Sequence, residues 1–178
     1  VSSYDDAHTY MVEQIKSVAS EERANVLISH CFLDGAEESE SERPLSIGGA
    51  DRVSYQPCVD FDYVALGHLH SPQYKGKDFI RYSGSILKYS FSEEKQKKGV
   101  TLVELNQGVV TTTLLPLQPQ RDMRIIEGEL EAILEQGKTD PNHQDYLLVR
   151  LTDRHAILDP MGKLRAVYPN VLHLEKPG

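Results

Sequence analysis

The chain has 178 residues, of which 39% are hydrophobic and 26% charged, so it can bury a real core and is not wholly disordered. Its formal net charge of −8 argues against a general nucleic-acid binder coated in Lys and Arg. No apolar run approaches the roughly 20 residues of a membrane helix, so we expect no membrane segment. The two cysteines, Cys31 and Cys58, form no CxxC motif, which argues against a zinc site of thiolates and favours a reducing cytoplasm.

The first two thirds of the chain read as one helix followed by short strands. Apolar residues at helical spacing predict an amphipathic helix over about residues 4–20: Tyr4, Ala7, Met11, Ile15 and Val18. A buried strand over 25–29 leads into His30, and further strands are predicted over 61–66, 79–82, 99–105 and 109–115. Residues 34–52 form a polar, acidic loop with a turn at Gly48-Gly49, and Gly108 makes a hairpin turn.

A second module follows Pro116 and Pro119, which bracket a segment with the composition of a linker. Strands over 123–126, 146–152 and 171–174 alternate with helices over 128–136 and 159–168, and Asp159 is the expected N-cap of the second helix. The predicted fold class is therefore α/β (α+β), with a small β-α-β-α-β module at the end. We expect its core to comprise Ile125, Leu130, Ile133, Leu147, Val149, Leu164, Val167 and Leu172.

Three histidines stand at the ends of two predicted strands. His30 follows the first strand, and His68 and His70 follow the second in the sequence GHLH. Functional groups gather at the carboxyl ends of parallel strands, and neutral imidazole is a good ligand for Mn, Fe, Co or Zn. A single His after a strand is more often structural, but GHLH behind an apolar strand is more specific and predicts metal binding. Gly67 is expected to let the backbone turn sharply there.

The carboxylates that a dinuclear phosphoesterase site needs have no recognisable motif in this chain. Before His30 the sequence has only one predicted helix and one predicted strand, and no D-x-H follows a strand there; a strand-end bridging Asp and a G-N-H-D/E turn are also not found. Three neutral imidazoles alone would hold two hard divalent cations poorly. The acidic stretch from Glu37 to Glu42 is expected to be a solvated loop rather than a source of ligands.

Several segments resemble one bacterial family. VLISHCF, SERPLSIGGADRV, FDYVALGHLHSPQ and IRYSGSILKYSFSE look like the second half of SbcD exonuclease subunits, which are calcineurin-like metallophosphoesterases. DYLLVRLTD and LDPMGKLRAVYPNVLHLE resemble the capping domain of the same family. The resemblance covers nearly the whole chain. It implies a partial metallophosphoesterase sheet sandwich over residues 1–117 and a capping domain over 118–178.

The resemblance also implies a metal site. The family binds two Mn²⁺ ions, with Mg²⁺ as an alternative, and carried over by motif His30 and His68 hold one ion and His70 the other. The family's remaining ligands and its transition-state His belong to motifs that are expected upstream of Val1. We therefore expect these 178 residues to contain no catalytic residue and to resemble a C-terminal fragment or a truncated homologue.

The partners that the resemblance implies are DNA and the SbcC ATPase, in DNA repair and recombination. An uncovered sheet face would also allow a homodimer. Two rival functions remain open: an enzyme for small phosphoesters, and a non-catalytic capping and interaction module. We expect the 178 residues alone to lack nuclease activity.

Cations near the histidines supply candidate DNA contacts. Residues 72–100 hold seven basic and three acidic residues, the one positive stretch of the chain. Arg43, Arg52, Arg81 and Lys88 are candidates for contacts with the DNA backbone, although each is equally plausible as a surface ion-pair partner.

Overall fold

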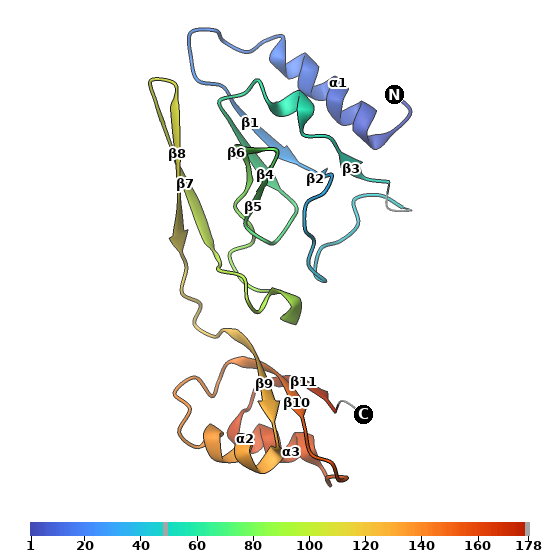
Figure 1. Ribbon diagram of the computed structural model, residues 1–178, viewed down its shortest axis with the longest axis vertical. Coiled ribbons are helices and arrows are strands. Elements are labelled where there is room, and N and C mark those ends of the chain that lie inside the picture. The colour runs from blue at the N-terminus through green and yellow to red at the C-terminus, as the bar shows by residue number, and fades with distance from the viewer. Residues whose placement is uncertain (48–49, 177–178) are drawn as a thin grey trace. The chain divides into compact units, whose positions relative to one another are not determined.

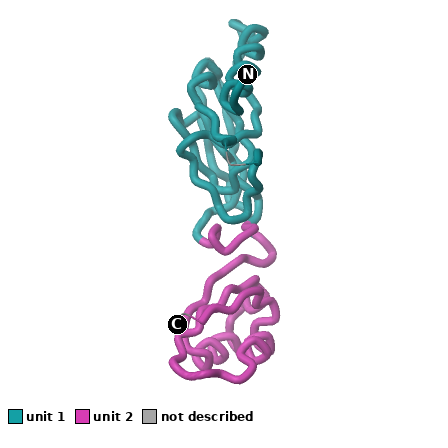
Figure 2. The backbone as a smooth tube through the Cα atoms, turned by 90° about the vertical axis from the view of Figure 1, so that its right-hand side faces the viewer, with its two compact units in different colours: residues 1–87, 95–118 teal, residues 88–94, 119–178 magenta. Residues whose placement is uncertain are grey.

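The structure is a computed structural model that describes residues 1–47 and 50–176. The predicted turn at Gly48-Gly49 lies outside the described residues. The fold is mixed α/β, which confirms the predicted class. Two compact units are present (Figure 2): residues 1–87 with 95–118, and residues 88–94 with 119–178. The assignment of 1–117 to a nuclease domain and of 118–178 to a capping domain stays a prediction, because compactness does not say what a unit does.

The first unit is built on a four-stranded sheet (Figure 1). Its strand order is β1 (Val26–His30), β4 (Tyr63–Gly67), β6 (Lys77–Tyr82) and β5 (Gln73–Lys75). The first three strands are parallel, and β5 runs antiparallel to β6. Parallel pairing brings the carboxyl ends of β1 and β4 to one edge of the sheet, which is where the histidines follow.

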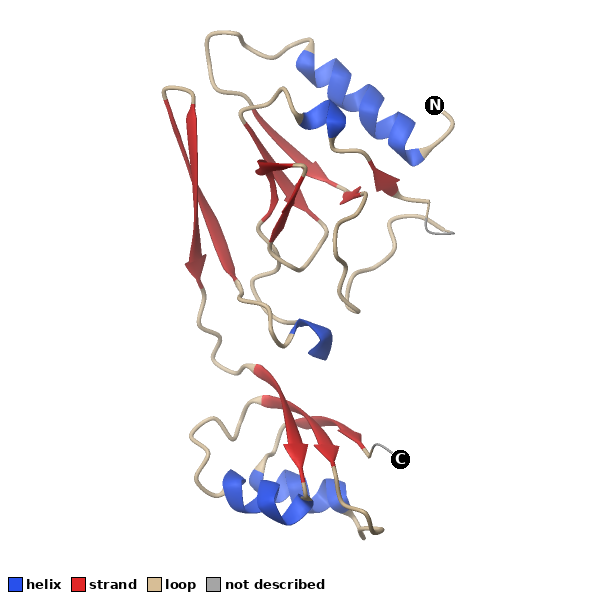
Figure 3. Ribbon diagram, viewed as in Figure 1, coloured by secondary structure: helices blue, strands red, loops and turns tan. Residues whose placement is uncertain are grey.

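Smaller elements surround this sheet (Figure 3). They are α1 (Tyr4–Lys16), the parallel pair β2 (Phe32–Leu33) and β3 (Arg52–Val53), the short 3-10 helix η1 (Gln56–Cys58), and the antiparallel ribbon of β7 (Gly99–Asn106) and β8 (Val109–Pro116). The hairpin turn at Gly108 is confirmed, since its φ of +80° is one that glycine adopts without strain. The short strands β2, β3 and β5 were not predicted from the sequence.

Helix α1 begins as expected and differs in its end and its buried face. The Ser3 side chain accepts a hydrogen bond from the Asp6 N–H, which caps the N-terminus, but the helix ends at Lys16 rather than near residue 20. The predicted apolar stripe is wrong: Met11 is 63% exposed, whereas Val12 is 3% exposed and packs in the core. The helix residue that packs in the core lies one position further along the chain than the apolar spacing indicated.

One face of the main sheet carries the core of the first unit. Leu27, Val64 and Ile80 are buried there together with Cys31. Alternation along the strands places Val26 and Ile28 on the opposite face. Ile28 is 81% exposed. The predicted buried first strand is present but is buried on one face only, because β1 is an edge strand.

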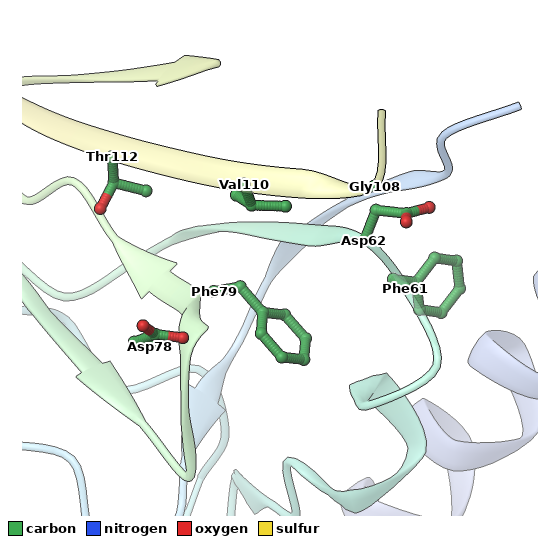
Figure 4. A pocket seen from close by; sticks show the side chains of 7 residues that line it. All are labelled: Phe61, Asp62, Asp78, Phe79, Gly108, Val110 and Thr112. Carbon is green, nitrogen blue, oxygen red and sulfur yellow. The ribbon is translucent and has the colours of Figure 1, made fainter. Parts of the chain in front are cut away.

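The ribbon β7–β8 leaves a hollow beside the main sheet (Figure 4). Its volume is about 360 Å³, and Phe79 of β6 lies in its wall across from Val110 and Thr112 of β8. Two carboxylates, Asp62 and Asp78, also line it. None of the three candidate histidines lies in its lining, so this hollow is separate from the candidate site.

The second unit has the predicted β-α-β-α-β order. It comprises β9 (Met123–Gly128), α2 (Leu130–Gly137), β10 (Tyr146–Leu151), α3 (Pro160–Val167) and β11 (Val171–Glu175), with η2 (Phe91–Glu93) from earlier in the chain. The three strands are parallel in the order β11-β10-β9. Asp159 caps α3 as predicted, because its carboxylate accepts the Gly162 N–H.

The core of the second unit matches the prediction in most positions. Leu130, Ile133, Leu147, Val149 and Leu164 are buried together. Leu172 was placed in the core wrongly and is 55% exposed, because Val171 takes the inward position of β11. Ile125 is likewise not among the buried cluster, whereas Leu151 and Tyr168 are. No helix in the described part of the chain combines the length and apolar character that crossing a bilayer requires.

Candidate metal centre

His30 and His68 are brought together at the carboxyl ends of β1 and β4. His30 is the last residue of β1 and lies opposite Gly67, the last residue of β4, so His68 is the next residue beyond the pairing. The two ring centroids are 5.4 Å apart, at an interplanar angle of 64°. This is the arrangement expected when two parallel strands end side by side, each followed or completed by a functional side chain.

The backbone turn after β4 occurs at His68 rather than at Gly67. His68 has a φ of +110°, a conformation that L-residues other than glycine rarely adopt. Gly67 contributes space instead: a Cβ there would lie 3.1 Å from Nδ1 of His30. The prediction of a sharp turn at Gly67 is therefore wrong by one residue, because the turn lies at His68. The strain is stored at the candidate ligand itself, which is common at binding sites.

Burial lowers the pKa of His68 below its ordinary value of 6.5, and the neighbouring His30 lowers it further. Glu42 and Asp51 act in the opposite direction. The net result favours the neutral imidazole at neutral pH. Neutral imidazole is the form that binds a metal ion.

His70 is held by three groups from the same unit. Its Nδ1 is 2.6 Å from the Ser41 hydroxyl, and its backbone N–H donates to Oε1 of Glu42 at 2.7 Å. Its carbonyl accepts a hydrogen bond from Nζ of Lys98, a buried cation that also donates to Ser85 and Gln96. The loop after β4 is therefore tied to the acidic loop on one side and to Lys98 on the other.

The acidic loop differs from the expected solvated segment at Glu42. Both of its carboxylate oxygens accept backbone N–H groups, from Ser39 and from His70. Asp51, further along the same loop, is buried and accepts the Leu45 N–H. Sequence reasoning missed these roles because side-chain bonds to the backbone of a distant segment leave no local pattern. The one available signal was that Glu42 lies within the SERPLSIGG motif.

The donor set fits one part of a metal site. The pair of imidazoles and the room that Gly67 leaves for the His30 ring suit a borderline transition metal. The nearby carboxylates are engaged with backbone N–H groups. Over residues 1–47 and 50–176, no group of three or more His, Cys, Asp or Glu side chains is arranged to hold a metal ion. The described residues thus supply imidazoles for such a site and no bridging carboxylate.

The four candidate DNA contacts lie in different settings. Arg52 stacks its guanidinium 4.5 Å over the Phe32 ring, and that ring lies 5.8 Å from the His68 ring, so this cation is near the imidazole pair. Arg43 is exposed in the acidic loop. Arg81 lies on β6 in the first unit, and Lys88 forms a 3.0 Å ion pair with Asp122 in the second unit. Arg52 also has an ion-pair partner, since its Nη1 lies 4.0 Å from Oδ1 of Asp34. Whether any of the four cations contacts DNA stays a prediction.

The first unit is thus a mixed α/β fold with two imidazoles paired at the ends of parallel strands. Comparison with known proteins identifies its relatives. A family profile described as SbcD_C, the type 5 capsule protein repressor C-terminal domain, matches residues 119–178. A Staphylococcus epidermidis protein, named as the D subunit of the nuclease SbcCD, is 41% identical over 175 residues, which is 98% of this chain. The chain is a homologue of SbcD nuclease subunits and spans 47% of the length of that relative.

Proposed function

We propose that this chain forms the carboxyl-terminal part of an SbcD-type nuclease subunit that hydrolyses phosphodiester bonds in DNA. The observation that carries the proposal is the 5.4 Å pairing of His30 with His68 at the ends of β1 and β4, within a chain homologous to SbcD subunits. His30 and His68 would hold one Mn²⁺ ion, and His70 a second; Mg²⁺ is the alternative. When bound, such cations activate water and neutralise charge on the phosphate.

Each of the chain's own residues has a distinct task in this proposal. Gly67 leaves space for the His30 ring, and the φ of His68 sets the direction of its side chain. Glu42 and Lys98 fix the backbone of His70 from two sides.

Two further parts complete the proposed site. Arg52, held on Phe32 near His68, is placed to attract a phosphate. The remaining metal ligands, and the transition-state His expected upstream of Val1, would come from parts of the subunit outside these 178 residues. In this proposal no residue from Val1 onward carries the catalytic step itself, and the chain supplies imidazole ligands and a phosphate contact.

The partners follow from the relationship to SbcD. DNA is the substrate and an SbcC-type ATPase is the companion subunit, acting in DNA repair and recombination in the cytoplasm. Residues 119–178, which match the SbcD C-terminal domain profile, would act as the capping domain. An enzyme for small phosphoesters is less well supported, because the homology extends through the second unit, which such chemistry does not require.

A chimeric protein tests the proposal. These 178 residues would replace the aligned 175 residues of the Staphylococcus epidermidis relative, and Mn²⁺-dependent digestion of linear duplex DNA would be measured. We expect cleavage by the chimera and a loss of at least about 100-fold for His30→Ala or His68→Ala, in keeping with the effect of removing a metal ligand. His143→Ala, an exposed histidine of the second unit, is the control and should cleave normally.

Two results would contradict the proposal. One is a folded, metal-loaded chimera that does not cleave DNA. The other is cleavage that persists in the His30→Ala and His68→Ala variants, which would place the metals elsewhere. If the chimera does not fold, binding of Ni²⁺ by the unmodified chain gives a second readout, and it should fall in both variants but not in His143→Ala.

The rival function as a non-catalytic interaction module has one observation in its favour. Among the described residues, no third His, Cys, Asp or Glu side chain joins the paired imidazoles to form a group that could hold a metal ion. In that case the chain would bind its partner subunit without contributing to chemistry. The His30→Ala chimera would then retain full cleavage.

A further inference from the structure

The hairpin of β5 and β6 presents an aromatic ring backed by a guanidinium group. Tyr74 and Arg81 lie directly opposite each other in the antiparallel pairing, so their side chains share one face of the sheet. The Arg81 guanidinium lies 5.2 Å from the centroid of the Tyr74 ring. The tyrosine is nevertheless 55% exposed, so a large part of its surface faces solvent. A half-exposed aromatic ring with a cation on one side is a ready stacking surface.

Positive charge is concentrated at the tip of the same hairpin. Lys75 and Lys77 flank Gly76 and are paired across the strands. The register is irregular at this point, and the Lys75 side chain extends toward Gly35, with Nζ about 4.0 Å from where a Cβ on that glycine would lie. Two cations so close in the chain favour an anionic partner such as phosphate. Residues 73–82 contain three cations and a single anion, Asp78, in a chain whose net charge is −8.

The hairpin is also held in a defined position. Gly76 has a φ of +72°, and a Cβ there would overlap the Tyr55 ring, so the tip packs tightly on that residue. The Gln73 side chain makes two hydrogen bonds to the backbone of Glu37, at 2.8 and 2.9 Å. The Nε of Arg81 donates to the Asp78 carbonyl at 2.9 Å, which fixes the guanidinium behind the ring. A surface that is already ordered loses less entropy when it binds.

We propose that this hairpin binds an unpaired segment of DNA, with one base stacked on Tyr74 and the flanking phosphates on Lys75 and Lys77. The inference rests on the proposed nuclease function and names the form of substrate that the chain contacts away from the histidines. An exposed ring backed by a cation accepts the flat face of any base, and bases are available for stacking only where they are unpaired. In duplex DNA the phosphates could contact the lysines, but no unpaired base would be available to stack on the Tyr74 ring.

The test measures binding of a fluorescein-labelled oligothymidylate to the 178-residue chain by fluorescence anisotropy in EDTA, so that cleavage plays no part. We expect Tyr74→Ala to weaken binding about tenfold, the size of a lost base–aromatic stack. Tyr10→Ala is the matched control, since Tyr10 on α1 is 58% exposed. Lys77→Gln should reduce the slope of log affinity against log salt by about 0.7. Lys163→Gln, on the exposed side of α3, should leave it unchanged.

The outcomes separate this inference from the proposed function. Equal binding by Tyr74→Ala and Tyr10→Ala would overturn it, as would the same tenfold loss on a blunt duplex, because a duplex has no free base to stack. Failure of the unaltered chain to bind the oligothymidylate would also overturn it. The chain could bind the oligothymidylate through Tyr74 while the chimera fails to cleave DNA. That pair of results would support the hairpin as a binding surface and refute only the nuclease proposal.

Discussion

The last residue of β4, Gly67, lies so close to the last residue of β1, His30, that a Cβ on the glycine would stand 3.1 Å from Nδ1 of the imidazole. Such a contact is tighter than ordinary van der Waals packing, so a methyl group there requires the ring to move by a few tenths of an ångström. The position of the ring relative to His68 therefore depends on the absence of a side chain at Gly67.

Gly67→Ala should weaken metal binding more than it weakens the fold. We expect Ni²⁺ affinity, measured by isothermal titration calorimetry, to fall about tenfold, as it does when the support of a ligand is disturbed. Gly128→Ala is the control, because a Cβ there meets Ile133 at an ordinary 3.6 Å. Equal affinities of the two variants would show that the His30 ring is not confined by β4.

The 178-residue chain by itself should not digest linear duplex DNA in Mn²⁺. The described residues bring two imidazoles together without a bridging carboxylate, and two cations need one to stay within the roughly 4 Å that in-line displacement uses. The assay compares the purified chain with a His68→Ala, His70→Ala double variant. Robust cleavage that the double substitution abolishes would mean that loop carboxylates such as Glu42 can leave their backbone partners and complete the site.

Arg124 should be a large contributor to the stability of the second unit. Its guanidinium donates to Asp145 at 2.7 Å and to Asp140 at 2.9 Å, and both carboxylates are almost fully enclosed. Removing the cation leaves two poorly solvated charges, so Arg124→Met should lower the free energy of unfolding by about 3 kcal/mol in urea titrations. Lys138→Met, which breaks an exposed pair with Glu135, should leave the midpoint unchanged. A neutral Arg124→Met variant would contradict this account.

The same network should make the second unit sensitive to acid. Burial raises the pKa of Asp140, but hydrogen bonds from Arg124, the Asn142 N–H and Tyr168 outweigh it and leave that pKa below 3.8. A lowered pKa contributes stability at pH values above 3.8, and this contribution disappears as the pH falls through the lower, folded value. Urea midpoints should therefore drop below about pH 4, and they should drop less steeply in Asp140→Asn. Parallel curves for the two proteins would exclude Asp140 as the cause.

The exposed edge of β1 should promote association of the isolated chain. Ile28 is 81% exposed on β1, the edge strand of the four-stranded sheet. An exposed apolar edge strand is a template for pairing with another chain. We expect concentration-dependent association in light scattering, and Ile28→Lys should reduce it. Val18→Lys, an exposed apolar residue beyond the end of α1, is the control. A chain that is monomeric at all concentrations would show that the edge is already protected.

Elements whose signal is local were predictable from the sequence. The ribbon turning at Gly108, the Asp159 cap and the alternation of strands and helices in the second unit each depend on residues close together in the chain. The buried face of α1 was not predictable in this way. Its apolar residues are spaced as a stripe, yet Val12 is buried in the core and Met11 is exposed to solvent. Tertiary packing overrides a weak amphipathic pattern.

In the candidate site, too, the features with a local sequence signal were predictable and the long-range contacts were not. The pairing of His30 with His68 follows from two apolar strands that each end at a histidine, so it could be anticipated once parallel pairing was assumed. The hydrogen bonds that Glu42 and Lys98 make to the backbone of His70 could not be anticipated. Each bond joins a side chain to a backbone group 28 positions away in the chain. The left-handed conformation fell on His68 rather than on the adjacent glycine, against residue preference.

The membership of residues 88–94 in the second unit has a consequence for how this protein can be cut and recombined. The polypeptide enters that unit twice, and Lys88 and Glu94 are bonded there to Asp122 and Ile125. A single cut near residue 118 would therefore yield a piece that lacks part of its own fold. Exchange of the complete unit between homologues would therefore require two separate stretches, residues 88–94 and 119–178, to be replaced together.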